Sequence, residues 1–142
     1  MSYSSDVETV EILINTWEQG TVDLTSEILA FCSGRGDGLC HIFVPHATAG
    51  LALVETGAGS EHDLLETLER ILPHEDNYKH QHGAVGHGAD HVVPAFLSPS
   101  LVLAVHHGEP LLGTWQSVVI VDTNTDNKNR RVALSFLGDS GE

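Results

Sequence analysis

Half of the histidines in this chain lie in one short, glycine-rich stretch. Of the ten histidines, five fall between residues 73 and 91: His74, His80, His82, His87 and His91. Imidazole is the commonest protein ligand for zinc-like metals, and it is the side chain that titrates near neutral pH. The stretch therefore predicts metal or proton chemistry on a loop. The alternative is a group of solvated loop histidines that share no function.

Two further residues lie where a rigid element meets a loop. His46 follows an apolar segment and opens the small-residue loop 46–50, and His91 stands next to Asp90 at the start of a predicted helical turn. Sites are often built at such element ends. Glu55 ends an apolar segment, which is less ordinary than an acidic residue on a polar helix face, and it is a candidate catalytic acid or a partner of a ligand.

Half of the basic residues gather within four positions. Lys128, Arg130 and Arg131 are three of only six Lys and Arg residues in the chain. Such a group can hold a phosphate through charge-assisted hydrogen bonds. Local neutralisation of Asp122 and Asp126 is an equally good explanation.

Composition excludes several classes of function. Twenty acidic residues against six basic ones give a net charge of −14, which disfavours nucleic acids and anionic membranes as partners. The chain has no dinucleotide fingerprint, no P-loop, no nucleophile elbow and no paired-cysteine or HExxH metal motif. No apolar run is long enough to cross a membrane, and the polar opening residues do not form a signal peptide, so we expect a cytoplasmic protein. Cys32 and Cys40 are expected to be free core thiols.

The elements that must position these residues follow from periodicity. Alternation of apolar residues predicts strands at 10–17, 22–24, 39–44, 51–54, 101–106, 111–121 and 131–137. Helical spacing predicts helices at 25–32, 60–72 and 92–97. The first two strands are expected to form a hairpin around Gly20, polar turns at 108–110 and 123–128 to join antiparallel strands, and Ser60 with Asp63 to form a capping box.

This pattern indicates the fold class. The chain of 142 residues is 41% hydrophobic, which suits one compact domain over residues 1–142. Strands at both ends enclose the helices, without the regular alternation of a doubly wound fold. We therefore expect a single α+β domain, a mostly antiparallel β-sandwich with two or three short helices.

Several motifs also resemble a known family. Phe43 to Gly50, Tyr78 to His80, Gly88 to His91 and above all Leu111 to Gln116, which contains Gly-Thr-Trp-Gln, are similar to the YjbQ-like family, and the similarity spans nearly the whole chain. The resemblance implies a homotrimer of an α+β sandwich with a histidine-lined pocket that holds a divalent metal such as zinc. It also implies a secondary thiamine-phosphate synthase activity.

The resemblance also assigns residues to roles. It implies metal ligation by His46, His80 and His91. Ala47 and Ala89 depart from the family pattern, and His82 or His87 can take a ligand's place. The candidate catalytic residues are Glu55, Asp90, Trp115 and Gln116, and the candidate substrate-binding residues are Thr48, Gly113, Thr114, Arg130 and Arg131.

Three hypotheses of function follow. In the first, the protein joins hydroxymethylpyrimidine diphosphate to thiazole phosphate and releases pyrophosphate, with zinc or, for the diphosphate, Mg²⁺ as cofactor. In the second, it is a metal-dependent hydrolase of a small phosphorylated or acyl metabolite, with Glu55 or Asp90 as the base. In the third, it is a trimer that binds a metabolite or metal without catalysis.

Overall fold

Two antiparallel sheets carry the fold. The computed structural model describes residues 7–17, 20–75 and 77–138. The five-stranded sheet has the order β1 (Val7–Asn15), β8 (Asn129–Gly138), β3 (Gly38–Phe43), β5 (Ser100–His106) and β6 (Glu109–Pro110). The three-stranded sheet has the order β2 (Thr21–Asp23), β7 (Ser117–Val121) and β4 (Gly50–Val54). The helical segments are α1 (Thr25–Cys32), α2 (Ser60–Ile71), α3 (His87–Asp90) and α4 (Val93–Phe96).

Strand β7 explains how the layers stack. Its Val-Val-Ile-Val run is buried on both faces, as expected of a strand with packing partners on each side. Val118 and Ile120 join the core that the five-stranded sheet and α1 share, whereas Val119 and Val121 pack with Leu68 and the other apolar residues of the α2 and α4 layer. The expected α+β sandwich is confirmed, with α2 and α4 as an additional layer.

The start of α2 differs from the expected capping box. Gly59 occupies the N-cap position with a φ of 102°, and no side chain caps the helix. Ser60 already lies in the first turn, so its hydroxyl cannot serve as the N-cap acceptor. Instead, Glu61 reaches back and accepts a hydrogen bond from the Gly57 N–H at 3.0 Å. The predicted helix is confirmed, but its predicted cap is wrong.

The expected opening hairpin is also wrong. β1 pairs along its whole length with β8, and β2 pairs with β7 in the other sheet. Local turn chemistry around Gly20 was a weaker determinant than burial, because Ile12 and Ile14 pack against the shared core only when β1 lies beside β8. The turn expected at 123–128 likewise joins strands of different sheets, and the strand expected at 111–121 begins only at Ser117.

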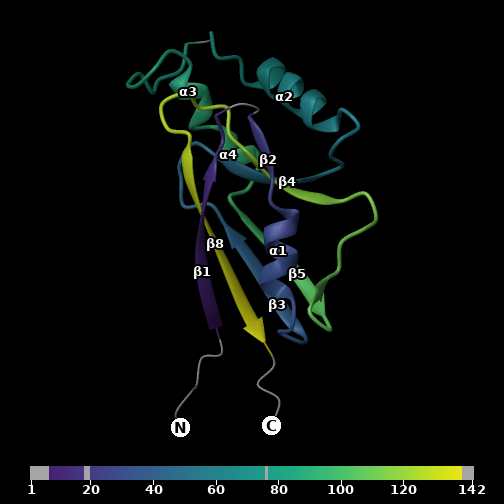
Figure 1. Ribbon diagram of the computed structural model, residues 1–142. Coiled ribbons are helices and arrows are strands. Elements are labelled where there is room, and N and C mark those ends of the chain that lie inside the picture. Colours follow the sequence, from purple (N-terminus) through teal and green to yellow (C-terminus); the bar gives the residue numbers. More distant parts are fainter. Residues whose placement is uncertain (1–6, 18–19, 76, 139–142) are drawn as a thin grey trace.

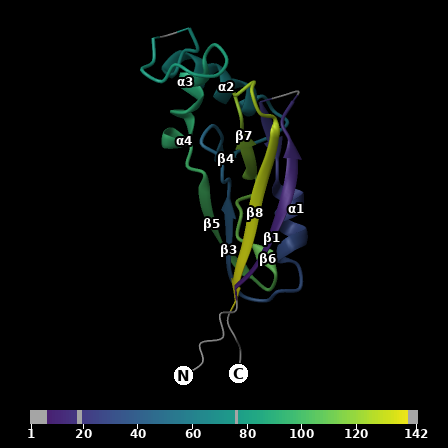
Figure 2. The same cartoon turned by 90° about the vertical axis from the view of Figure 1, so that its left-hand side faces the viewer.

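The helices at one end of the sheets frame the histidine stretch. α2, α3 and α4 cluster at the top of both views, and the start of β1 lies beside the end of β8 at the opposite end (Figures 1 and 2). The pair Arg130 and Asp122 is buried and connects β8 to the segment that follows β7. Within the described residues, no helix has the length and hydrophobicity needed to cross a membrane.

Candidate metal centre

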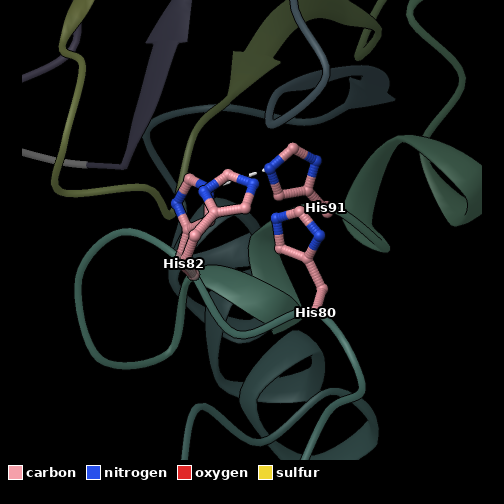
Figure 3. Close-up of side chains that lie close together, drawn as sticks. His80, His82 and His91 are labelled. Carbon is pink, nitrogen blue, oxygen red and sulfur yellow. Dashed lines mark hydrogen bonds between the residues drawn. The ribbon is translucent and has the colours of Figure 1, made fainter.

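Four imidazoles converge at the α3 end of the molecule. His80, His82, His87 and His91 each offer a ring nitrogen, and these four atoms lie within 4.8 Å of one another. Figure 3 shows the rings of His80, His82 and His91 facing a common centre. Four nitrogen donors at this spacing suit Zn²⁺ and similar ions, which prefer four ligands in a tetrahedral arrangement.

The short helix α3 supplies two of the four rings. His87 begins α3 and His91 is its C-cap residue, so the two side chains lie one turn apart on the same face. Their Nε2 atoms are 2.8 Å apart. The helix starts after Gly86, whose φ of 85° suits glycine and lets the chain turn sharply into α3.

The other two rings come from the preceding extended segment. His80 and His82 are two residues apart, and their ring centroids are 3.9 Å from each other. Gly88 lets this segment lie against α3, because a Cβ at Gly88 would be 2.5 Å from the Tyr78 Cβ and 2.9 Å from the His80 carbonyl oxygen. The close approach brings the His80 ring to 4.2 Å from that of His91, measured between centroids.

A carboxylate behind the site fixes the orientation of His87. The Asp126 carboxylate is 2.8 Å from the His87 Nδ1 atom and also accepts a hydrogen bond from the Ala84 N–H at 3.2 Å. A proton on Nδ1 leaves the Nε2 lone pair free to bind a metal. Asp126 therefore orients a ligand and holds the loop between the two histidine pairs.

A second carboxylate, Asp90, ties α3 to its surroundings. Asp90 is 3% exposed, and its oxygens accept hydrogen bonds from Thr123 Oγ1 at 2.7 Å and Asn124 Nδ2 at 2.9 Å. His74 Nε2 lies 2.8 Å from Asp90, and its Nδ1 lies 2.5 Å from Glu69 of α2. The network continues through the Asn124 N–H to Asp122. These contacts hold α3 in place relative to α2 and β7.

Electrostatics favour neutral ligands at the centre. Burial lowers the pKa of His80 and of His91, and the neighbouring imidazoles lower both further. A lowered pKa keeps these rings unprotonated, which is the form that binds a metal. His74 behaves differently: burial acts to lower its pKa, but hydrogen bonds and attraction from Glu69 and Asp90 outweigh burial and raise the pKa.

A polar cavity lies beside the four imidazoles. Its volume is about 350 Å³, and its walls include His80, His82 and His87 together with Glu75 and Gln81. None of the described residues that line it is a lysine or an arginine. The cavity is large enough for a small metabolite, and its walls carry no fixed positive side chain to attract an anion.

The structure brings together only part of the predicted ligand set. His80 and His91 lie in the group, and His82 and His87, expected as substitutes, join them. His46 is not in this group, because its Nε2 accepts a hydrogen bond from the Arg131 backbone N–H at 2.9 Å. Burial and the nearby Arg130 and Arg131 lower the pKa of His46.

Two predicted roles are disfavoured by burial. Arg130 is 1% exposed, and its guanidinium donates to Asp122 Oδ1 and Oδ2 and to Thr48 Oγ1. Arg130 therefore neutralises Asp122, which was the alternative to a phosphate-binding role for this residue. Asp90 is equally enclosed and its oxygens are engaged, so its position is that of a support for α3 and does not suit a catalytic base.

The remaining candidates lie elsewhere in this chain. Gly113 to Gln116 form a turn in which the Gly113 N–H donates to Gln116 Oε1 at 2.8 Å, and Trp115 is 74% exposed. Glu55 follows β4, whose last residue pairs with Ser117, so Glu55 lies near this turn. The segment between β6 and β7, at the right of Figure 1, is remote from α3. Arg131 is exposed near Glu11.

Sequence reasoning missed the supporting residues Thr123, Asn124 and Asp126. Their segment was expected to be a polar turn, in which Asp126 is neutralised by the nearby basic residues. The signal was present in the sequence as a run of short polar side chains, Asp-Thr-Asn-Thr-Asp-Asn, directly after the fully apolar β7. At the end of a buried strand, such residues form hydrogen bonds with neighbouring backbone and side-chain groups more often than they are fully solvated.

Comparisons with known proteins agree on one family. Residues 10–139 match the family described as UPF0047 protein YjbQ-like. A UPF0047 protein of Mycobacterium tuberculosis is 57% identical over 124 residues, which cover 87% of this chain and 93% of that protein. The UPF0047 protein YjbQ of Escherichia coli is 30% identical over 103 residues, which cover 72% and 75% of the two chains.

Solved structures show the same fold. A crystal structure from Sulfolobus solfataricus, described as a YbjQ-like protein of unknown function, superposes with a TM-score of 0.86 at 27% identity and covers 94% of this chain and 98% of that chain. A hypothetical protein from Aeropyrum pernix gives a TM-score of 0.85 at 27% identity, with coverage of 93% and 99%.

Proposed function

This chain belongs to the UPF0047 YjbQ-like family, and we propose that it is a metal-dependent protein whose ion is held by His80, His82, His87 and His91. The observation that carries the proposal is the convergence of four ring nitrogens within 4.8 Å, braced from behind by Asp126. Solvated loop histidines have no reason to share a centre, nor to have a carboxylate orienting one of them.

The donor set selects the class of metal. Four imidazoles suit Zn²⁺ and its first-row neighbours, whereas Mg²⁺ requires oxygen ligands in an octahedral arrangement. Mg²⁺ therefore does not fit this group of residues. When bound, a zinc-like ion supplies a Lewis acid that polarises an oxygen or lowers the pKa of water.

The chain's own residues have distinct roles in this proposal. Asp126 holds a proton on the His87 Nδ1 atom, so that the ring presents its Nε2 atom to the centre. Asp90 and His74 keep α3 in position against α2. The backbone at Gly88 allows His80 to approach, and the cavity beside His82 receives the small molecule.

The cavity favours hydrolysis of a small metabolite over thiamine-phosphate synthesis. The synthase reaction uses a diphosphate and a phosphate, and such substrates are usually held by arginine or lysine. The described part of the cavity wall has neither, and Glu75 adds negative charge. The buried Arg130 is already paired with Asp122. We therefore place the metal-dependent hydrolase first and the synthase second, with a catalytically inactive metal or metabolite binder as the third reading.

Self-association is a further part of the proposal. The outer face of the five-stranded sheet carries Val7, Leu39, Val102 and Leu137, each 44% to 53% exposed. Together with His41 and Ser135 they line an apolar hollow of about 340 Å³. A contiguous apolar patch of this kind is typical of a protein interface. It supports assembly with further copies of this chain, as the expected homotrimer requires.

Elemental analysis tests the metal assignment. Protein purified without an affinity tag is expected to contain close to one zinc-class ion per chain, and a His87→Ala, His91→Ala double variant to contain none. The matched control is His62→Ala, because His62 is an exposed histidine of α2 outside the group. Absence of metal from the native protein, even after incubation with Zn²⁺, would overturn the proposal.

A turnover screen separates the three readings. A hydrolase converts a single substrate, such as a small carboxylic ester, in a reaction that depends on His87 and His91. A synthase needs hydroxymethylpyrimidine diphosphate and thiazole phosphate together and releases pyrophosphate. Tight binding of metal without turnover in either assay is the result expected of a binding protein.

A further inference from the structure

We propose that His82 is an exchangeable ligand, which leaves the centre when a small neutral or monoanionic molecule enters the cavity, while His80, His87 and His91 hold the metal throughout. This inference rests on the proposed metal function and adds to it the device that opens the site and the class of molecule that enters.

Exposure and ring packing distinguish His82 from the other three rings. His82 is exposed to solvent, whereas His87 and His91 are partly buried. The His80 ring lies closer to His91, at 4.2 Å between centroids, than the His82 ring does, at 5.9 Å. Rotation of an exposed side chain is fast and meets little resistance from neighbours. His82 is therefore the ring whose departure disturbs the protein least.

The backbone on both sides of His82 is anchored. The His80 carbonyl packs against Gly88, and the Ala84 N–H donates to Asp126. Gly83, with a φ of 82°, lies so close to His87 that a Cβ there would be 2.8 Å from the ring. Departure of His82 therefore requires rotation of its side chain and not movement of the loop.

The four histidines also differ in the contacts that hold them in place. His87 is oriented by Asp126, and His91 follows the buried Asp90 at the end of α3. His80 is held through its backbone contact with α3. Among the residues that the structure describes, none forms a hydrogen bond with the His82 imidazole, whose contacts are with the rings of His80, His87 and His91.

The residues that line the cavity determine which molecule can replace His82 as a ligand. His82 forms part of the cavity wall together with His80 and His87, so a molecule in the cavity can take the ligand position that His82 occupies. Because the lining residues that the structure describes include Glu75 and no lysine or arginine, they offer no positive side chain to a polyanion such as a diphosphate. A neutral or singly charged molecule with one donor atom is the class that fits.

Cobalt substitution tests the proposal, because the absorption of Co²⁺ reports its ligands directly. The variants are His82→Ala, His87→Ala and the control His62→Ala, each compared with the wild type. Loss of an outer-sphere partner usually weakens metal binding by about 10- to 100-fold. We expect His82→Ala to weaken Co²⁺ binding by less than this range, under about tenfold, and His87→Ala by more than this range, over about a hundredfold. Free imidazole is expected to restore the wild-type spectrum of His82→Ala.

Azide then tests exchange in the wild type. It should bind the Co²⁺-loaded wild type with a new absorption band, and it should bind His82→Ala at a concentration about tenfold lower, as expected if His82 is absent from the ion about a tenth of the time. Equal loss of Co²⁺ from His82→Ala and His87→Ala, or no azide binding to the wild type, would overturn the inference while leaving the metal site intact. A wild type that binds no Co²⁺ would overturn both.

Discussion

The Nε2 atoms of His87 and His91 lie 2.8 Å apart, one helical turn from each other at α3. Two nitrogen ligands of one tetrahedral zinc ion, with bonds near 2.0 to 2.1 Å, are separated by roughly 3.3 Å. At the shorter distance the two rings share a hydrogen bond, so one of them carries the proton on Nε2. Metal binding must therefore move that proton from Nε2 to Nδ1 of the same ring and increase the separation of the two Nε2 atoms by about half an ångström.

Asp126→Asn is expected to weaken zinc binding. The amide can no longer accept the proton of His87 Nδ1 as a charged partner, and loss of an outer-sphere carboxylate costs about 10- to 100-fold in metal affinity. Competition with a chromophoric chelator measures the change. Asp63→Asn, in the first turn of α2, is the matched control and should leave the affinity unchanged. An unaltered affinity in Asp126→Asn would show that this carboxylate does not support the site.

Arg130→Met should destabilise the fold, and Arg131→Met should not. Removal of Arg130 leaves the buried Asp122 carboxylate without its cationic partner, which costs about 3 to 5 kcal/mol in the free energy of unfolding. Arg131 is exposed and contacts Glu11 only at 3.8 Å, so its replacement should change stability by less than about 0.5 kcal/mol. Urea denaturation measures both. Similar small effects of the two changes would show that the Arg130–Asp122 pair does not stabilise the fold.

His74 makes the stability of the metal-free protein depend on pH. Its pKa is raised from the ordinary value of 6.5, so its contribution is complete below about 6.5 and is lost as the pH rises through the folded-state pKa. The pKa of Glu69 is lowered from 4.5, mainly by its hydrogen bonds with His74, so that contribution is lost as the pH falls below 4.5.

The difference in unfolding free energy between the wild type and His74→Gln should therefore be largest between about pH 4.5 and 6.5 and decline on both sides. Denaturant titrations across this range provide the measurement. His62→Gln, whose ring is exposed on α2, is the control for replacing a surface histidine. A difference that grows steadily with rising pH would contradict the ion pair.

Val102→Glu should disrupt self-association. Val102 lies opposite His41 in the five-stranded sheet and is 53% exposed on its apolar outer face. A charge there must be desolvated if another copy covers the face. Light scattering coupled to size-exclusion chromatography should report a smaller species than the wild type. Ile71→Glu, at equal exposure on α2, is the control, and loss of assembly in that variant alone would move the interface away from this sheet.

Much of the local structure was determined by the sequence alone. Helical periodicity predicted α2, alternation predicted β3, β5 and β8, and the Gly-Thr-Trp-Gln and Pro-His motifs indicated the family that the comparisons confirm. Each of these inferences depends on neighbours within a few positions, where the repeat of a helix or strand fixes which side chains face the core. The concentration of histidines between residues 73 and 91 likewise needed no structure to be noticed.

Only the tertiary structure decided which of these residues meet. Pairing of β1 with β8 and of β2 with β7 overrode the local hairpin signal, because burial of Ile12 and Ile14 outweighed turn chemistry. The same long-range packing placed Asp126 behind His87, enclosed Arg130 with Asp122, and left His46 bonded to the Arg131 backbone. Periodicity encodes the face on which a side chain lies, whereas the distance between two loops depends on how distant strands pair, and that information is not local.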